Sequence, residues 1–154
     1  MNKKALILGA TSSLAIVFCR ELALNGWDLI LCGRNFYELK TLASDISIRY
    51  AVKCKIIVVD LNDKNFSPKS ILKKARNFNN LFVFAGTLAS QNESYSFDGI
   101  NSNVRVNFLS IIQLVESSLE ILQKNKNSKL LFISSVAGDR GRKSNYIYGS
   151  TKAA

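Results

Sequence analysis

The sequence predicts an α/β fold, a Rossmann-like doubly wound parallel sheet that forms a single domain over residues 1–154. Short apolar runs rich in Ile, Leu and Val alternate with longer segments of helical periodicity, and this alternation is typical of repeated βαβ units. The short runs are almost continuously apolar, as expected for strands that helices cover on both faces. A doubly wound sheet of this kind has the strand order 3-2-1-4-5.

The expected strands are the short apolar runs at Lys4–Gly9, Asp28–Cys32, Lys55–Asp60, Leu81–Ala85 and Leu130–Ser134. The segments between them have the apolar period of helices, at Ser13–Asn25, Phe36–Tyr50, Pro68–Phe78 and Asn101–Gln123, and a last helix begins near Tyr146. The third helix has a clear start, because Ser67 supplies a capping hydroxyl and Pro68 suits the first helical position.

The longest irregular stretch is Thr87–Gly99, which is rich in Ser and Asn. It follows the fourth strand at the edge where open parallel sheets bind their ligands. This position predicts a lid over a bound ligand. An ordinary solvated loop is the equal alternative.

The composition is that of an ordinary globular domain, with 47% hydrophobic and 21% charged residues, and it excludes disorder as the main state. The net charge of +10 raises the question of an anionic partner. The basic residues are scattered, and no aromatic side chains interleave with them as a stacking surface requires, so we expect no nucleic-acid partner. No stretch reaches the ~18 apolar residues of a membrane span.

Cys19, Cys32 and Cys54 are an odd number of cysteines without a Cys-x-x-Cys pair, and the chain has no histidine. We therefore expect neither a metal site nor a disulfide framework. Buried thiols in a reducing compartment fit this pattern, which indicates a cytoplasmic protein.

The first predicted strand runs through Gly9–Ala15 directly into an amphipathic helix. The backbone N–H groups and the dipole of such a helix form an anion-binding cradle, and a glycine at the turn lets a pyrophosphate approach the backbone. Only Gly9 is a glycine here, so an ordinary tight connection explains the turn equally well. The candidate phosphate contacts are Gly9, Thr11, Ser12, Ser13 and Leu14.

The second predicted strand is followed by Arg34, at the position where dinucleotide folds read the adenosine ribose. A carboxylate there binds the 2′-hydroxyl of NAD(H), whereas a guanidinium can fork onto a 2′-phosphate. Arg34 therefore favours NADP(H) over NAD(H), and a plain surface arginine is the alternative. Asp60, at the end of the third strand, would lie near the adenine amino group, although an acidic residue at the end of a strand needs no such explanation.

The end of the chain carries the most specific pattern. Tyr148 and Lys152 form a Tyr-x-x-x-Lys motif, Ser135 precedes Tyr148 by thirteen positions, and Asn107 lies in the long fourth helix. In these four residues, and from the phosphate turn to its last residue, the chain resembles the short-chain dehydrogenase/reductase family. One departure is Phe84, which stands where the family has an asparagine in its Asn-Asn-Ala-Gly motif.

The resemblance implies a nicotinamide-dependent oxidoreductase that reduces a carbonyl or oxidises an alcohol of a small molecule, and Arg34 favours NADP(H) as its cofactor. Tyr148 and Lys152 share a helical face, and an adjacent ammonium lowers the pKa of a phenol from about 10, so Tyr148 is the predicted acid and base. The resemblance further implies that Ser135 binds the reacting oxygen, that Lys152 holds the nicotinamide ribose, and that Asn107 anchors a water that relays protons. The predicted cofactor contacts also include Leu61, Ala85, Gly86, Tyr148 and Lys152.

The chain ends at Ala154, whereas members of this family continue further, so strands six and seven and the substrate-binding helices are missing. The leading interpretation is therefore the amino-terminal part of a longer reductase, for which the resemblance implies a homo-oligomer. The alternative is a chain naturally complete at 154, which would be a non-catalytic dinucleotide-binding or interaction module, or a decayed enzyme.

Overall fold

The computed structural model describes residues 3–88 and 96–154, and it contains one five-stranded parallel sheet in the order β3-β2-β1-β4-β5. This is the predicted order. The strands are β1 (Lys4–Leu8), β2 (Asp28–Gly33), β3 (Cys54–Val58), β4 (Asn80–Val83) and β5 (Lys129–Phe132). They lie within two residues of their predicted starts and ends, and β1 is the central strand.

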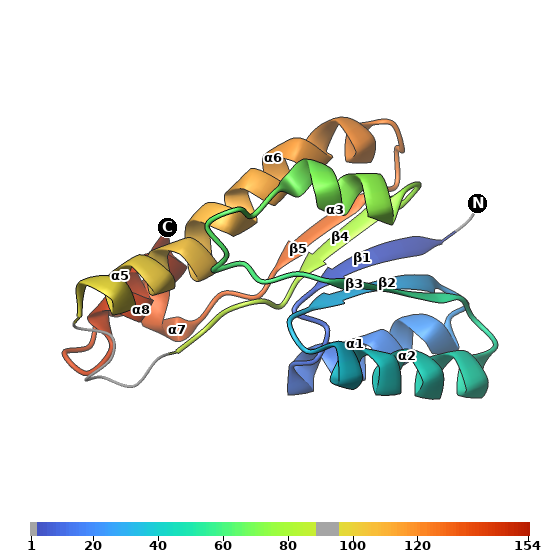
Figure 1. Cartoon of the computed structure of the whole chain (residues 1–154), viewed down its shortest axis with the longest axis horizontal. Coiled ribbons are helices and arrows are strands. Elements are labelled where there is room, and N and C mark those ends of the chain that lie inside the picture. Colours follow the sequence, from blue (N-terminus) through green and yellow to red (C-terminus); the bar gives the residue numbers. More distant parts are fainter. Residues whose placement is uncertain (1–2, 89–95) are drawn as a thin grey trace.

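Helices cover both faces of the sheet (Figure 1). Helices α1 (Ser13–Leu24) and α2 (Phe36–Tyr50) pack on one face, and α3 (Pro68–Ala75) and α6 (Ser110–Gln123) pack on the other. Among the described residues, three more helices lie beyond the carboxyl ends of the strands, namely α5 (Phe97–Val104), α7 (Val136–Asp139) and α8 (Tyr146–Ala153).

Each face of the sheet has its own hydrophobic core. Alternate residues of a strand point to opposite faces, so Leu6 and Leu8 enter the core under α3 and α6, while Ala5 and Ile7 enter the core under α1 and α2. All four are at most 1% exposed. The carboxyl end of β1, from which the candidate site extends, is thus fixed by packing on both sides.

Helix α3 ends three residues earlier than predicted. The next two residues, Arg76 and Asn77, have positive φ angles of 37° and 57°, and a left-handed backbone cannot continue an α-helix. The backbone therefore turns there and leads Phe78 into the core and Asn80 to the start of β4.

The predicted helix Asn101–Gln123 was wrong in two respects. It begins earlier, at Phe97, because the Ser96 hydroxyl accepts a hydrogen bond of 2.9 Å from the N–H of Gly99 and caps α5. It is also interrupted by a π-helical turn, η1 (Arg105–Leu109), between α5 and α6. The predicted loop Thr87–Gly99 is correspondingly shorter, and its residues 89–95 lie outside the described part of the chain.

Within residues 3–88 and 96–154, no helix combines the length and the apolar character that crossing a bilayer requires. The same described part holds Cys19 and Cys32 as buried free thiols and Cys54 as a partly buried one, in keeping with the predicted buried thiols.

Candidate functional site

A cavity of about 250 Å³ opens at the carboxyl ends of β1, β2 and β4. Most of the predicted cofactor residues line it together, namely Gly9, Thr11, Ser12, Arg34, Asp60, Leu61, Ala85 and Gly86. The sequence had not singled out Thr87 and Val106, which complete the wall on the side of η1. The predicted contacts Ser13 and Leu14 lie outside this lining, on the exposed first turn of α1.

Gly9 lets the first and fourth strands approach each other at the floor of this cavity. Its φ angle is +80°, and a Cβ atom at this position would lie 2.6 Å from the backbone nitrogen of Ala85. Both observations require glycine. They show that the backbone of the turn lies directly against the backbone of Ala85. A loosely packed connection would not need glycine at this position.

The amino end of α1 offers unpartnered donors to this cavity. Ser12 caps the helix by accepting a hydrogen bond from Ala15 N–H, and its own N–H donates to the carbonyl of Gly9. Within the described residues, no acceptor meets the N–H groups of Ser13 and Leu14. Free N–H groups at a positive helix end suit a bound phosphate, so the turn fits the pyrophosphate of a dinucleotide.

Arg34 is exposed at the mouth of the cavity, next to Thr11, Asn35 and Glu38. The Glu38 carboxylate accepts a hydrogen bond of 2.9 Å from the Asn35 side chain, which also caps α2. No carboxylate in the described part of the chain forms an ion pair with Arg34, so its guanidinium can receive an anion. Asp60 lines the same cavity and also accepts the N–H of Asn62, which fixes one carboxylate oxygen in the turn after β3.

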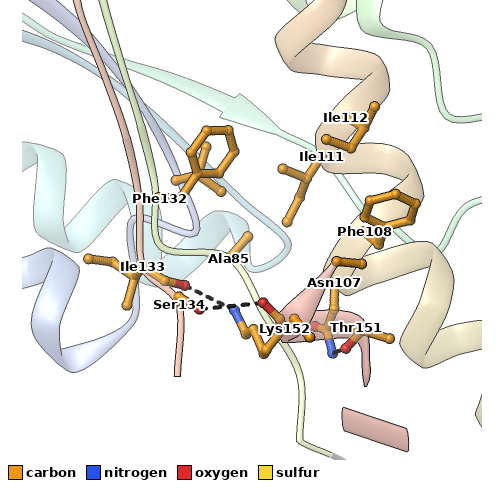
Figure 2. A pocket seen from close by; sticks show the side chains of 13 residues that line it. Ala85, Asn107, Phe108, Ile111, Ile112, Phe132, Ile133, Ser134, Thr151 and Lys152 are labelled. Atoms are coloured by element: carbon orange, nitrogen blue, oxygen red, sulfur yellow. Dashed lines mark hydrogen bonds between the residues drawn. The ribbon is translucent and has the colours of Figure 1, made fainter. Parts of the chain in front are cut away.

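Lys152 reaches from α8 toward the end of β4 (Figure 2). Its Nζ donates a hydrogen bond of 3.1 Å to the carbonyl of Ile133 and lies 5.9 Å from the centre of the Tyr148 ring. A Cβ atom on Gly86 would come within 3.1 Å of the same Nζ. Burial lowers the pKa of Lys152 below its usual 10.5. The ammonium thus lies between the ring of Tyr148, which is the candidate acid and base, and Gly86. Gly86 is at the floor of the cavity that Gly9 and Arg34 line, which we call the dinucleotide cavity.

Asn107 lies buried in the π-helical turn and joins three segments. Its Oδ1 accepts the N–H of Thr87 at 2.7 Å, and its Nδ2 donates to the carbonyl of Thr87 at 2.9 Å and to Thr151 Oγ1 at 3.1 Å. Both amide hydrogens therefore have protein partners. This geometry makes the side chain a brace for the segment after β4.

Thr151 is a site residue that the sequence reasoning missed. It is buried, and its hydroxyl accepts from Asn107 and donates to the carbonyl of Tyr148 at 2.7 Å. It therefore fixes the helix that carries Tyr148 relative to η1. Its position inside the Tyr-x-x-x-Lys motif was the only signal that could have marked it.

The neighbouring serines Ser134 and Ser135 have different partners. The Ser134 hydroxyl donates to the carbonyl of Lys152 at 3.4 Å and so ties the end of β5 to α8. The Ser135 hydroxyl accepts the N–H of Ala137 at 3.2 Å as the cap of α7. Because this bond uses the oxygen as an acceptor, the Ser135 O–H remains free to donate to a substrate oxygen.

Two further residues that the sequence reasoning missed, Gly138 and Gly149, let α7 and α8 pack closely. A Cβ atom on Gly149 would lie 2.6 Å from the carbonyl oxygen of Ala137, and one on Gly138 would lie 2.9 Å from the backbone nitrogen of Ala153. No described hydrogen bond joins Ser135 to Tyr148, so the relative position of the helices that carry them depends on this packing of α7 against α8.

A second cavity of about 250 Å³ lies between α6, β5 and α8 (Figure 2). Lys152, Asn107 and Thr151 line its polar end, and the remaining wall is mainly apolar, from Phe108, Ile111, Ile112 and Phe132. Ala85 lines both cavities, so the two spaces adjoin at the end of β4.

Comparison with known families gives one match along nearly the whole chain, to the family described as short chain dehydrogenase, over residues 3–154. Among curated proteins, the chain is 23% identical to an uncharacterised oxidoreductase of Staphylococcus epidermidis, over 99% of this chain and 66% of that protein. It is 28% identical to an uncharacterised oxidoreductase of Mycobacterium tuberculosis, over 91% of this chain and 57% of that protein. The chain thus spans between 57% and 66% of the length of these relatives.

Solved structures show the same fold. One is a 7β-hydroxysteroid dehydrogenase, with a TM-score of 0.89 and 21% identity over 98% of this chain and 59% of that one. Another is a short-chain dehydrogenase from Sphingobium yanoikuyae in complex with NADPH, with a TM-score of 0.88 and 23% identity over 98% and 60% of the two chains.

Proposed function

Because the chain belongs to the short-chain dehydrogenase family, we propose that it is the dinucleotide-binding and catalytic part of an NADP(H)-dependent oxidoreductase that reduces a carbonyl or oxidises an alcohol of a small molecule. The observation that carries this proposal is the position of Lys152, whose ammonium lies beside the Tyr148 ring and against Gly86 at the floor of the dinucleotide cavity.

Tyr148 is the proposed acid and base. In the reducing direction its hydroxyl gives a proton to the substrate oxygen, and in the oxidising direction its oxygen takes that proton back. The ammonium of Lys152 favours the deprotonated oxygen that is left after proton donation, because opposite charges attract strongly in a partly buried site. A bound nicotinamide dinucleotide would supply or accept the hydride.

Ser135 and Asn107 have different proposed roles. Ser135 donates its free O–H to the same substrate oxygen and so stabilises the charge that develops there. Asn107 is a positioning residue: through Thr87 and Thr151 it fixes the two segments that carry Gly86 and Tyr148.

NADP(H) is the proposed cofactor, with Arg34 as the residue that distinguishes it from NAD(H). Arg34 stands exposed at the cavity mouth without a carboxylate partner among the described residues, where a 2′-phosphate can receive its planar fork of donors. Arg34→Gln should weaken NADPH binding by about ten-fold or more, as expected for the loss of a charge-assisted pair, and leave NADH binding unchanged. An equal loss for both cofactors, measured by the fluorescence of the bound dinucleotide, would contradict the assignment.

The decisive test of catalysis compares Tyr148→Phe with Tyr146→Phe. Removing the acid and base should lower NADPH-dependent reduction of a panel of aldehydes and ketones by about 10²- to 10⁴-fold, while NADPH binding persists. Tyr146→Phe, on the same helix but half exposed, should keep the parent rate. Ser135→Ala should lower the same rate, because it removes the O–H that is proposed to donate to the substrate oxygen. Equal rates in the two tyrosine variants would refute the role of Tyr148.

A non-catalytic dinucleotide-binding module is the second candidate. The observation that favours it is the exposure of β5, where Leu130, Leu131 and Phe132 are each 36–45% exposed beside the cavity that contains Lys152. This candidate predicts NADPH binding that depends on Gly9 and Arg34, with no reduction of any carbonyl and no effect of Tyr148→Phe. The same assays therefore separate the two candidates. For both candidate functions we propose a cytoplasmic protein, and for the catalytic function we also propose a homo-oligomer.

A further inference from the structure

Basic residues gather at the amino edge of the sheet, opposite the candidate site. Lysines stand at the starts of β1, β3 and β5, and because the helices run back along the sheet, α3 and α6 end at this edge with lysines and an arginine (Figure 1). We call these residues the basic edge: Lys3, Lys4, Lys53, Lys55, Lys73, Lys74, Arg76, Lys124, Lys126 and Lys129. They are almost half of the 21 basic residues in the chain.

Little negative charge offsets the basic edge. Glu120 pairs with Lys124 at 3.5 Å, and among the described residues no other member of the basic edge has a carboxylate partner. Asp28, at the start of β2, accepts the backbone N–H of Lys53 and adds one negative charge to this edge, and Glu21 accepts from the side chain of Asn25 near the end of α1. Ten basic side chains still outnumber Glu120, Asp28 and Glu21 there.

Two of the lysines are oriented by the end of α3. The ammonium of Lys55 donates to the carbonyl of Lys74 at 2.7 Å, and that of Lys4 donates to the carbonyl of Arg76 at 3.4 Å. Carbonyl groups carry no net charge, so these two hydrogen bonds leave the charges of Lys4 and Lys55 uncompensated.

The chemistry of the basic edge suits a lipid surface. Nine of its ten members are lysines, which act as point charges, whereas specific recognition of phosphate groups and base edges favours the bidentate fork of arginine. None of the five described cavities is lined by a member of the edge, so these residues form no described pocket for a small anion.

Apolar side chains accompany the charges. Leu24 ends α1 and is 68% exposed, Ile48 lies near the end of α2 and is 82% exposed, and Trp27 is partly exposed between α1 and β2. Aliphatic side chains and a tryptophan can enter the headgroup layer of a bilayer, and a nucleic acid backbone offers them no such layer.

We propose that the basic edge docks the protein on the surface of a membrane that contains anionic lipids, with Leu24 and Ile48 entering the headgroup layer and the exposed part of Trp27, which packs on the core beside Phe82, at the boundary of that layer. The candidate site opens at the carboxyl ends of the strands, on the opposite edge, so docking leaves it accessible from solution. This proposal stands on charge and exposure alone and does not depend on the proposed enzymatic function.

The test measures sedimentation of the full chain with phosphatidylcholine vesicles that contain either no phosphatidylglycerol or about one-third phosphatidylglycerol. The triple variant K53Q/K126Q/K129Q removes three charges from the basic edge. The matched control K40Q/K64Q/K69Q removes three exposed lysines from elsewhere on the surface, so both variants have the same net charge. Thermal unfolding of all three proteins checks that each is folded.

Binding should require phosphatidylglycerol and weaken at high salt. The edge variant should lose about 100-fold in affinity, because each lysine at an anionic surface contributes about five-fold, whereas the control should lose less than about ten-fold. Ile48→Ser should weaken vesicle binding further without changing the salt dependence. No binding to anionic vesicles, an equal loss in both triple variants, or tighter binding to duplex DNA than to vesicles at the same salt would each overturn the proposal.

Discussion

Strands β1 and β5 have similar apolar sequences and opposite surroundings. In β1, Ala5 to Leu8 are at most 1% exposed, whereas in β5, Leu130 to Phe132 are 36–45% exposed. β1 lies at the centre of the sheet with helices on both faces, and β5 lies at its edge. An apolar run therefore predicts a strand, and its neighbours decide how deeply that strand is buried.

The same contrast separates the two halves of the candidate site. The dinucleotide half, around Gly9, rests on β1 and β2, which are buried except at their first residues, Lys4 and Asp28. The catalytic half, around Lys152, is held by hydrogen bonds from Asn107 and Thr151 and by close glycine contacts. We therefore expect the dinucleotide half to respond to substitution mainly through packing and the catalytic half mainly through the geometry of α7 and α8.

The largest expected effect is that of Gly9→Ala in the dinucleotide half. The new Cβ would lie 2.6 Å from Ala85 N, and the backbone has a φ of +80°. Steric overlap and left-handed strain together should lower the free energy of unfolding by about 4 kcal/mol. The control is Gly26→Ala, where φ is +75° but nothing lies within 4 Å, so only the strain of about 1 kcal/mol remains. Similar losses in the two variants, measured by urea unfolding, would mean that β1 and β4 can move apart.

A pair of leucines compares the two strand environments directly. Leu31 in β2 is fully buried, so Leu31→Ala should cost about 3 kcal/mol of unfolding free energy from lost transfer and cavity formation. Leu131 in β5 is 36% exposed, so Leu131→Ala should cost about 1 kcal/mol. The expected ratio is therefore about three to one by urea unfolding. A cost for Leu131 equal to that for Leu31 would show that β5 is covered in solution, for example by a second copy.

Most of the fold could be predicted from the sequence because its strands are short, apolar and parallel, a pattern that few architectures accommodate. The errors lie where single residues set the local backbone. Arg76 and Asn77 end α3 with positive φ angles. Asn often adopts this conformation, but Arg does not, so the end of the helix before Arg76 could not be predicted from its residue type. Ser96 starts α5 inside a stretch whose Ser and Asn content indicated a loop.

Some residues of the candidate site could also be predicted from the sequence, and others could not. Tyr148, Lys152 and Ser135 could be selected from spacing, because residues four apart on a helix share a face and the family motif fixes their order. Thr151, Gly138 and Gly149 could not be selected, because their roles come from contacts between η1, α7 and α8 that no spacing reveals. The engagement of both Asn107 amide hydrogens was hidden for the same reason.

The catalytic half should respond to Gly149→Ala. A Cβ there would lie 2.6 Å from the carbonyl oxygen of Ala137, so α8 must move away from α7, at a cost of about 2 kcal/mol. Because α7 carries Ser135 and α8 carries Tyr148, turnover should fall further than stability predicts while NADPH binding is retained. The control, Gly141→Ala in the loop between these helices, meets nothing within 4 Å and should change neither. A loss of NADPH binding equal to the loss of turnover would contradict the separation of the two halves.

The smallest expected effect comes from Asp45, on the outer surface of the dinucleotide half. Hydrogen bonding from Arg49, and then from Arg20, holds the pKa of Asp45 below its usual 3.8. A carboxyl whose pKa is lowered by folding adds stability above pH 3.8, and this contribution disappears as the pH falls through the lower folded value. Asp45→Asn should therefore lower the Tm slightly at pH 7, and the difference from the parent should shrink as the pH falls below 3.8. Because these side chains meet solvent, high salt should also reduce the difference.

The control is Arg49→Gln, which removes the strongest partner of Asp45 and should flatten the same pH dependence of the Tm. If the difference in Tm between Asp45→Asn and the parent persists unchanged at low pH, the effect comes from helix propensity. Packing would then be the main source of stability in the dinucleotide half.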